Sequence, residues 1–156
     1  SSDELLERAK PFLPKNKKPK SYLLKVIALE QPRVKRLSEL PEKVDYFFRD
    51  PEYDKELLRW KNMSDEEMIG SLDKAIELLN KLVRFNLHNL EKAFLKEAEG
   101  LSDRGILLWP LRMALTGKKA SPGPFEIMEI LGVEETKKRL LAAKEKLLTF
   151  RPKVRD

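Results

Sequence analysis

The stretch after Ser64 carries the strongest structural signal in the sequence, because its apolar residues recur at the spacing of an α-helix. Steps of one, three and four positions separate Met68, Ile69, Leu72, Ala75, Ile76, Leu79, Leu82 and Val83. A helix gathers such positions on one face, whereas a strand would point them to both sides. Ser64 and Glu67 have the spacing of a capping box, in which each side chain accepts a hydrogen bond from the other residue's backbone N–H. The sequence therefore predicts a long amphipathic helix after Ser64.

Helix start and stop signals cover most of the remaining chain. Ser1 and Glu4 form a second capping-box pair, and Gly100 and Gly117 stand where helices are expected to end. Further helices are expected at 22–31 after Ser21, 38–48, 90–99 after Asn89, from Ser102 or Asp103 to Thr116, 122–131 after Ser121, and around 140–148. With 10 Pro, 6 Gly and no alternating β-branched runs, hairpins are disfavoured. We predict an all-α protein of about eight to ten helices.

The charge is unevenly distributed along the chain. Residues 1–41 carry 10 basic and 5 acidic side chains, residues 42–100 carry 10 and 14, and residues 101–156 carry 12 and 7. Two basic ends would attract a polyanion, although a solvated mixed surface would give the same pattern. A seam near Asn62 is expected to divide a basic N-terminal subdomain, 1–61, from a C-terminal one, 62–156.

Several kinds of chemistry are excluded by composition. The chain has no Cys and a single histidine, His88, so disulfides and thiolate or multi-histidine metal sites cannot be assembled, and we expect no Ser-His-Asp triad. No glycine-rich phosphate loop is present. We therefore expect no catalytic residue, no metal site and no cofactor in this chain. No apolar run approaches the roughly 18 to 20 residues that span a bilayer, so we expect no membrane partner and a cytoplasmic protein.

The most unusual stretch is WPLRMALTGKKASPGPFEIMEILG, residues 109–132. It places one cation, Arg112, among apolar neighbours on a helix that Pro110 should kink, and a short basic loop then leads to Ser121. An Arg beside a hydroxyl and a helix N-terminus could hold nucleic-acid backbone and base edges. Alternatively, Arg112 is a structural residue that binds helix-end carbonyls. The residues alone leave both interpretations open.

The same stretch resembles a known family. PLRMALTG followed by SPGPFEIMEILG is similar to the PLR-x-ALTG…[ST]-PG-x-FE…LG signature near the C-terminus of bacterial glutamyl-tRNA synthetases. PRVKRLSEL at 32–40 resembles the family's ER-x-KTL-x-EL, and the likeness spans residues 1 to about 150. Two positions depart from the pattern: Arg36 replaces the usual Thr, and Pro124 stands where a large apolar residue is common.

The resemblance implies the two-subdomain helical anticodon-binding cage of a class I aminoacyl-tRNA synthetase. The partner would be the anticodon loop of glutamate tRNA, whose unpaired bases can be splayed and read. By this analogy Arg112 and Ser121 contact anticodon bases, Pro124 lies at an adjacent contact, and Arg33 reads the third base. Phosphate contacts are expected, by charge, from Lys15, Lys17, Lys18, Lys20, Lys118 and Lys119.

The resemblance also implies a parent enzyme, a glutamate–tRNA ligase whose catalytic domain, on the same polypeptide, uses ATP and Mg²⁺. The start SSDELLERA, without an initiator Met, suggests a piece of such a protein, and we expect a monomer. Two other classes stay open: a helical protein-interaction domain with acidic partners, and a free-standing RNA-binding protein. The signature around Arg112 favours the synthetase domain, because a docking domain has no reason to carry it.

Overall fold

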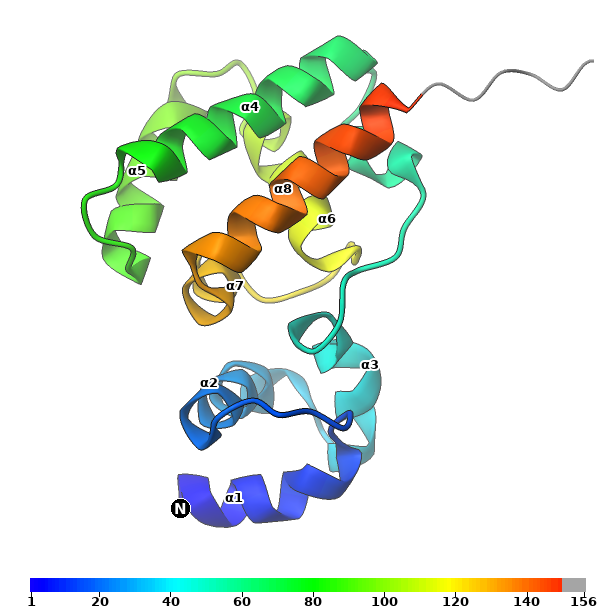
Figure 1. The fold of residues 1–156 in the computed structure, drawn as a ribbon, viewed down its shortest axis with the longest axis vertical. Coiled ribbons are helices and arrows are strands. Elements are labelled where there is room, and N and C mark those ends of the chain that lie inside the picture. Colours follow the sequence, from blue (N-terminus) through cyan, green and yellow to red (C-terminus); the bar gives the residue numbers. More distant parts are fainter. Residues whose placement is uncertain (150–156) are drawn as a thin grey trace, which may run out of the picture.

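The computed structural model describes residues 1–149, and every regular element within them is helical (Figure 1). This confirms the predicted all-α class. The α-helices are α1 (Ser2–Ala9), α2 (Lys20–Glu30), α3 (Leu40–Val44), α4 (Asp65–Lys81), α5 (Leu87–Glu99), α6 (Gly105–Thr116), α7 (Pro124–Leu131) and α8 (Val133–Leu148). Short 3-10 helices are η1 (Lys10–Phe12), η2 (Gln31–Arg33), η3 (Leu37–Glu39), η4 (Asp45–Phe47) and η5 (Lys55–Leu58). None of the helices is long and apolar enough to cross a membrane within residues 1–149.

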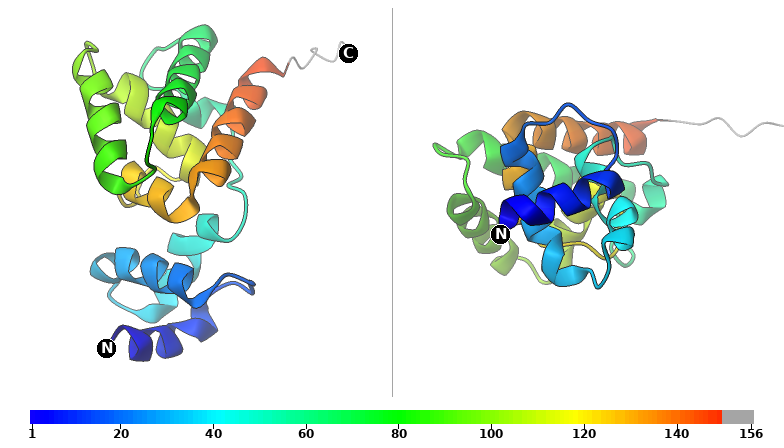
Figure 2. Two further views of the ribbon diagram at one scale, coloured as in Figure 1. Left: turned by 60° about the vertical axis from the view of Figure 1, so that its left-hand side comes forward. Right: turned by 90° about the horizontal axis from the view of Figure 1, so that it is seen from below.

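The helices form a smaller lobe, α1 to α3, and a larger lobe, α4 to α8, and the chain passes between them along one side (Figures 1 and 2). Helices α2 and α7 face each other across the seam. The segment η5 packs on α6 and α8, so the chain crosses to the larger lobe before residue 55. A division into subdomains 1–61 and 62–156 stays a prediction, and the packing of η5 favours an earlier crossing.

The core of the larger lobe is built by α4, α6 and α8, with α5 and α7 beside them. The capping box of Ser64 and Glu67 is present, with both hydrogen bonds at 3.1 Å. The predicted apolar face of α4 is buried at Met68, Leu72, Ala75 and Leu79. Each buried Leu or Met side chain contributes about 1.5 to 3 kcal/mol.

Three large apolar side chains are exposed within the described residues, and one of them, Val83, was expected on the apolar face of the long helix. Val83 is 98% exposed, since α4 ends at Lys81 and Val83 falls in the following loop. Leu141 and Leu148 of α8 are 53% and 57% exposed. Leu140 and Leu147 of the same helix point into the core instead, because neighbouring helical residues face about 100° apart.

Helix α6 runs through Pro110 without interruption. Proline has no N–H to donate to the carbonyl four residues earlier, which here is that of Ile106. The hydroxyl of Ser71, on α4, donates to this carbonyl at 2.7 Å and so replaces the lost bond. The expected start at Ser102 or Asp103 is corrected to Gly105, whose N–H donates to the Asp103 carboxylate at 2.9 Å.

Other predicted helix starts are also corrected. Helix α2 begins at Lys20 after Pro19, so Ser21 lies inside its first turn and does not cap it. Helix α5 begins at Leu87, because Asn86, not Asn89, supplies the capping oxygen, at 2.9 Å from the Asn89 nitrogen.

The single helix expected at 38–48 is divided into η3, α3 and η4. The neighbours Tyr46 and Phe47, both in η4, are each 1% exposed. Residues i and i+3 share a face in a 3-10 helix as well as in an α-helix, so the apolar spacing did not distinguish the two here.

Arg139 joins the larger lobe to the chain that leaves the smaller one. It is 5% exposed and pairs with Glu135 at 3.0 Å on α8. Its Nη1 donates to the Leu115 carbonyl at 2.7 Å, and its Nη2 donates to the Arg49 carbonyl at 3.3 Å. A buried, fully engaged guanidinium of this kind fixes three segments relative to one another.

Candidate nucleic-acid interface

The loop that joins α6 to α7 lies at the seam between the lobes (Figure 1). It begins at Gly117, whose φ of 67° is a left-handed conformation that ends the helix and favours glycine. The Thr116 hydroxyl donates to the Arg112 carbonyl at 2.9 Å and accepts from the Lys118 N–H at 2.9 Å. These bonds give the start of the loop a defined course.

Arg112 and Ser121, both predicted site residues, are in direct contact. The half-buried Arg112 uses Nη1 to donate to the Ser121 hydroxyl, to the Ser121 carbonyl at 3.1 Å and to the Pro122 carbonyl at 2.8 Å. Its Nε and Nη2 make no hydrogen bond to any residue that the structure describes. The guanidinium is therefore anchored through one nitrogen, while the others remain available to a ligand.

The helix start expected at Ser121 is corrected. Helix α7 begins at Pro124, with Gly123 before it in an extended conformation. A residue that precedes proline is disfavoured in the helical region, so Gly123 cannot extend α7 toward Ser121. Ser121 is therefore not an N-cap, and its hydroxyl donates to the Pro122 carbonyl at 2.9 Å. Pro124 is buried at the first position of α7 and does not present a free surface to a ligand.

Arg33 approaches the same seam from the smaller lobe. It lies in η2, its side chain is 36% exposed, and its Nε is 3.6 Å from Oε2 of the buried Glu30. Burial lowers the pKa of Arg112, and the nearby positive charge of Arg33 lowers it further. Arg112 and Arg33, from different lobes, thus interact electrostatically.

The six predicted phosphate-binding lysines have different surroundings. Lys20 pairs with Asp3 at 2.9 Å, and Lys118 pairs with Asp45 at 3.3 Å. Lys18 lies over the ring of Tyr22 at 4.9 Å. The remaining three are exposed and have no ion pair within residues 1–149: Lys15, Lys17 and Lys119.

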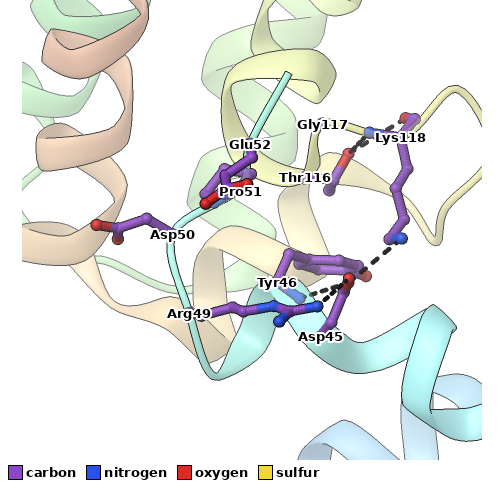
Figure 3. Close-up of a pocket in the computed structure, with 9 residues that line it drawn as sticks. All are labelled: Asp45, Tyr46, Arg49, Asp50, Pro51, Glu52, Thr116, Gly117 and Lys118. Atoms are coloured by element: carbon purple, nitrogen blue, oxygen red, sulfur yellow. Dashed lines mark hydrogen bonds and ion pairs between the residues drawn. The ribbon is translucent and has the colours of Figure 1, made fainter.

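Two polar hollows flank Lys118. One, of about 250 Å³, lies between η4 and the turn after α6, with Asp45, Arg49 and Lys118 on its walls (Figure 3). The other, of about 470 Å³, contains Arg33 and Lys118. No group of three or more His, Asp or Glu side chains suited to a metal ion occurs within the described residues. Cations, hydroxyls and backbone groups of this kind suit recognition of nucleic acid.

The comparisons with known proteins agree with this geometry. The family model for the anticodon binding domain matches residues 4–144. The chain belongs to the anticodon-binding-domain family. A glutamate–tRNA ligase of Clostridium tetani is 42% identical over 129 residues, covering 80% of this domain and 26% of that protein. One of Moorella thermoacetica is 37% identical over 149 residues, covering 88% and 30%.

A solved structure shows the same fold. It is a glutamate tRNA ligase from Elizabethkingia meningosepticum in complex with its amino acid, with a TM-score of 0.79 and 25% identity over 94% of this domain and 30% of that chain. The domain thus spans less than a third of the length of these relatives.

Sequence reasoning missed two residues of the anticodon-binding domain's seam, Glu30 and Tyr46, each 1% exposed. Glu30 could have been found, because it continues the face of α2 that buries Leu23, Val26 and Ile27. A charged residue on an apolar helical face is an inconsistency that a pattern can reveal. Tyr46 carries no such signal.

Proposed function

We propose that this domain holds the anticodon loop of glutamate tRNA on behalf of a glutamate–tRNA ligase of which it forms part. The observation that carries the proposal is the anchoring of Arg112 by Ser121 and Pro122, which leaves part of its guanidinium available at the seam. The names of the relatives support the choice of tRNA and of parent enzyme.

In this proposal Arg112 and Arg33 contact unpaired anticodon bases from opposite lobes. An arginine offers paired, coplanar donors that match two acceptors on a base edge. Ser121 orients Arg112 through its hydroxyl and carbonyl. Pro124 contributes by shaping the start of α7, since it is buried.

The lysines neutralise phosphates on either side of the loop. Lys15, Lys17 and Lys119 do so without breaking an existing ion pair within the described chain, whereas Lys20 and Lys118 must leave Asp3 and Asp45. Such contacts position the RNA without reading its sequence.

The remaining chemistry belongs to the parent protein. ATP and Mg²⁺ would be bound by its catalytic domain on the same polypeptide, and this domain contributes tRNA selection without a cofactor of its own. The parent enzyme would act in the cytoplasm, as a monomer.

Footprinting on a glutamate tRNA transcript tests the proposal. The domain is expected to protect the anticodon loop from single-strand nucleases and to leave the acceptor end and the opposite corner of the tRNA exposed. A transcript with another tRNA's anticodon provides the control and should be protected weakly. Uniform protection of both transcripts, or none, would contradict the proposed function.

A further inference from the structure

A buried carboxylate lies beside Arg33, and the packing of the smaller lobe does not require it. Glu30 is the last residue of α2, and only 1% of it is exposed. Its Oε2 accepts no hydrogen bond from any residue in 1–149. A buried ionised carboxylate is costly unless a cation compensates it. An apolar side chain at position 30, like those of Val26 and Ile27 on the same helix, would be buried without that cost. The carboxylate therefore needs an explanation other than stability.

The cation beside it is held on one side only. Nε of Arg33 lies 3.6 Å from Glu30 Oε2, and the Arg33 side chain is 36% exposed. Within the described residues Arg33 has no ion-pair partner other than Glu30, and its side chain makes no hydrogen bond. Arg33 lines the hollow of about 470 Å³ together with Glu30 and Lys118. Glu30 thus engages the inner edge of the guanidinium and leaves its outer donors for a ligand.

A second arginine, Arg112, acts on Arg33 from the larger lobe. Burial lowers the pKa of Arg112, and the positive charge of Arg33 lowers it further. Like charges repel, and Glu30 is the anion that lies beside Arg33, 3.6 Å from its Nε. Tyr46 belongs to the same cluster: its hydroxyl lacks a partner in the described chain, and burial, followed by the charge of Glu30, raises its pKa.

We propose that Glu30 is the positioning residue for Arg33, holding its guanidinium in the direction from which the third anticodon base is read. The inference rests on the proposed function and adds a specificity determinant to it. Glu30 itself does not touch the RNA, because it is buried beneath Arg33.

The test compares two anticodon stem-loops that differ only in the third anticodon base, cytosine as in glutamate tRNA or guanine as in glutamine tRNA. Paired base-edge contacts of an arginine are worth roughly 5- to 150-fold in discrimination. In the 156-residue chain, Glu30→Gln keeps the side-chain shape and removes the charge. The measured quantity is the dissociation constant for the guanine RNA divided by that for the cytosine RNA. We expect Glu30→Gln to reduce this ratio by about threefold or more, because Arg33 loses its fixed direction.

Glu42→Gln is the matched control. Glu42 is an exposed carboxylate on the same hollow and forms no ion pair within residues 1–149. Its neutralisation should tighten both RNAs to the same extent, since it changes only the general field. A Glu30→Gln variant that behaves like Glu42→Gln would overturn the inference.

A double variant separates a positioning role from a structural one. In an Arg33→Gln background, Glu30→Gln should change the ratio no further, because the residue through which it acts is gone. An equal loss of discrimination in both backgrounds would contradict the inference. If Glu30→Gln does not fold, Glu30→Asp retains the charge but withdraws it from Arg33, and it should also reduce the ratio. A wild-type ratio near one would show that the third base is not read and would overturn the inference, whereas failure to bind either stem-loop would overturn the proposed function.

Discussion

In the proposed function, Arg112 serves the loop and the ligand with different atoms of one side chain. Nη1 binds Ser121 and Pro122, which is the structural role considered from the sequence, and the other nitrogens are available for base recognition. The two interpretations are therefore compatible, and a substitution should affect stability and specificity separately.

Arg112→Lys tests this division. A lysine can retain part of the anchoring but cannot offer paired coplanar donors. We expect affinity for the glutamate anticodon stem-loop to fall by about 1 to 3 kcal/mol, and affinity for an anticodon-swapped loop to change little. Titrations of both RNAs and a thermal melt measure the two effects. A stability loss above about 1 kcal/mol with equal weakening of both RNAs would make Arg112 structural only.

Asp103 provides a pH-dependent test of the larger lobe. Its carboxylate accepts from Lys61 at 2.5 Å, from the Gly105 N–H at 2.9 Å and from the Trp60 indole at 3.0 Å. These bonds, that from Lys61 foremost, lower its pKa from 3.8 to about 2. Because the folded pKa is depressed, the stabilisation is complete above about pH 4 and is lost as the pH falls toward 2.

Asp103→Asn should therefore unfold at lower urea concentration than the wild type at pH 7. The difference should shrink as the pH approaches 2, where the wild-type carboxyl also becomes neutral. A difference that stays constant from pH 7 to pH 2 would show that the carboxylate charge contributes nothing.

At the scale of the helix, replacing either of two helical glycines by alanine should change the free energy of unfolding, in opposite directions. A Cβ at Gly70, on the exposed side of α4, would meet nothing within 4 Å. A Cβ at Gly105, at the start of α6, would lie 2.1 Å from the Trp60 ring. That ring also packs against Trp109 with centroids 5.4 Å apart, so it cannot move freely.

Gly70→Ala should raise the free energy of unfolding by about 0.5 to 1 kcal/mol, because alanine restricts the unfolded chain and favours helix. Gly105→Ala should lower it by roughly 1 to 3 kcal/mol through overpacking against Trp60. Urea melts of both variants measure the pair. Equal stabilisation by both would mean that Trp60 does not pack at the start of α6.

Local signals in the sequence predicted the helices better than their first residues. The capping boxes at Ser1 and Ser64 were confirmed, because both partners of a box lie within one turn. The starts predicted at Asn89 and Ser121 were wrong. Asn86 supplies the cap of α5, and Pro124 makes α7 begin three residues after Ser121. A single polar residue near a helix start does not show which of several neighbours supplies the cap.

The contact between Arg112 and Ser121 was anticipated from a motif in which they stand nine positions apart, whereas the cluster of Glu30, Arg33 and Tyr46 depends on packing that no local pattern records. The same limit applies to the arrangement of the lobes. The hydrogen bond from Arg139 to the Arg49 carbonyl joins residues 90 positions apart.

At the scale of the whole molecule, RNA binding should depend strongly on salt. If about three to five phosphates are neutralised by the lysines and arginines of the two lobes, the single-strand slope of roughly −0.7 per phosphate gives about −2 to −3.5 on a log–log plot. Lys119→Ala should make the slope shallower by about 0.7 and weaken all RNAs alike, since phosphates carry no sequence. A flat dependence would favour a protein-docking surface.

The most direct test of an anticodon-binding role is the ratio of two dissociation constants for the 156-residue chain. One RNA is a stem-loop with the glutamate anticodon, and the other has the same stem and loop length with all three anticodon bases replaced. Both present the same phosphates, so only base recognition separates them. The proposed function predicts binding at least about tenfold tighter for the glutamate anticodon, the equivalent of about 1.4 kcal/mol. Equal affinities would contradict it.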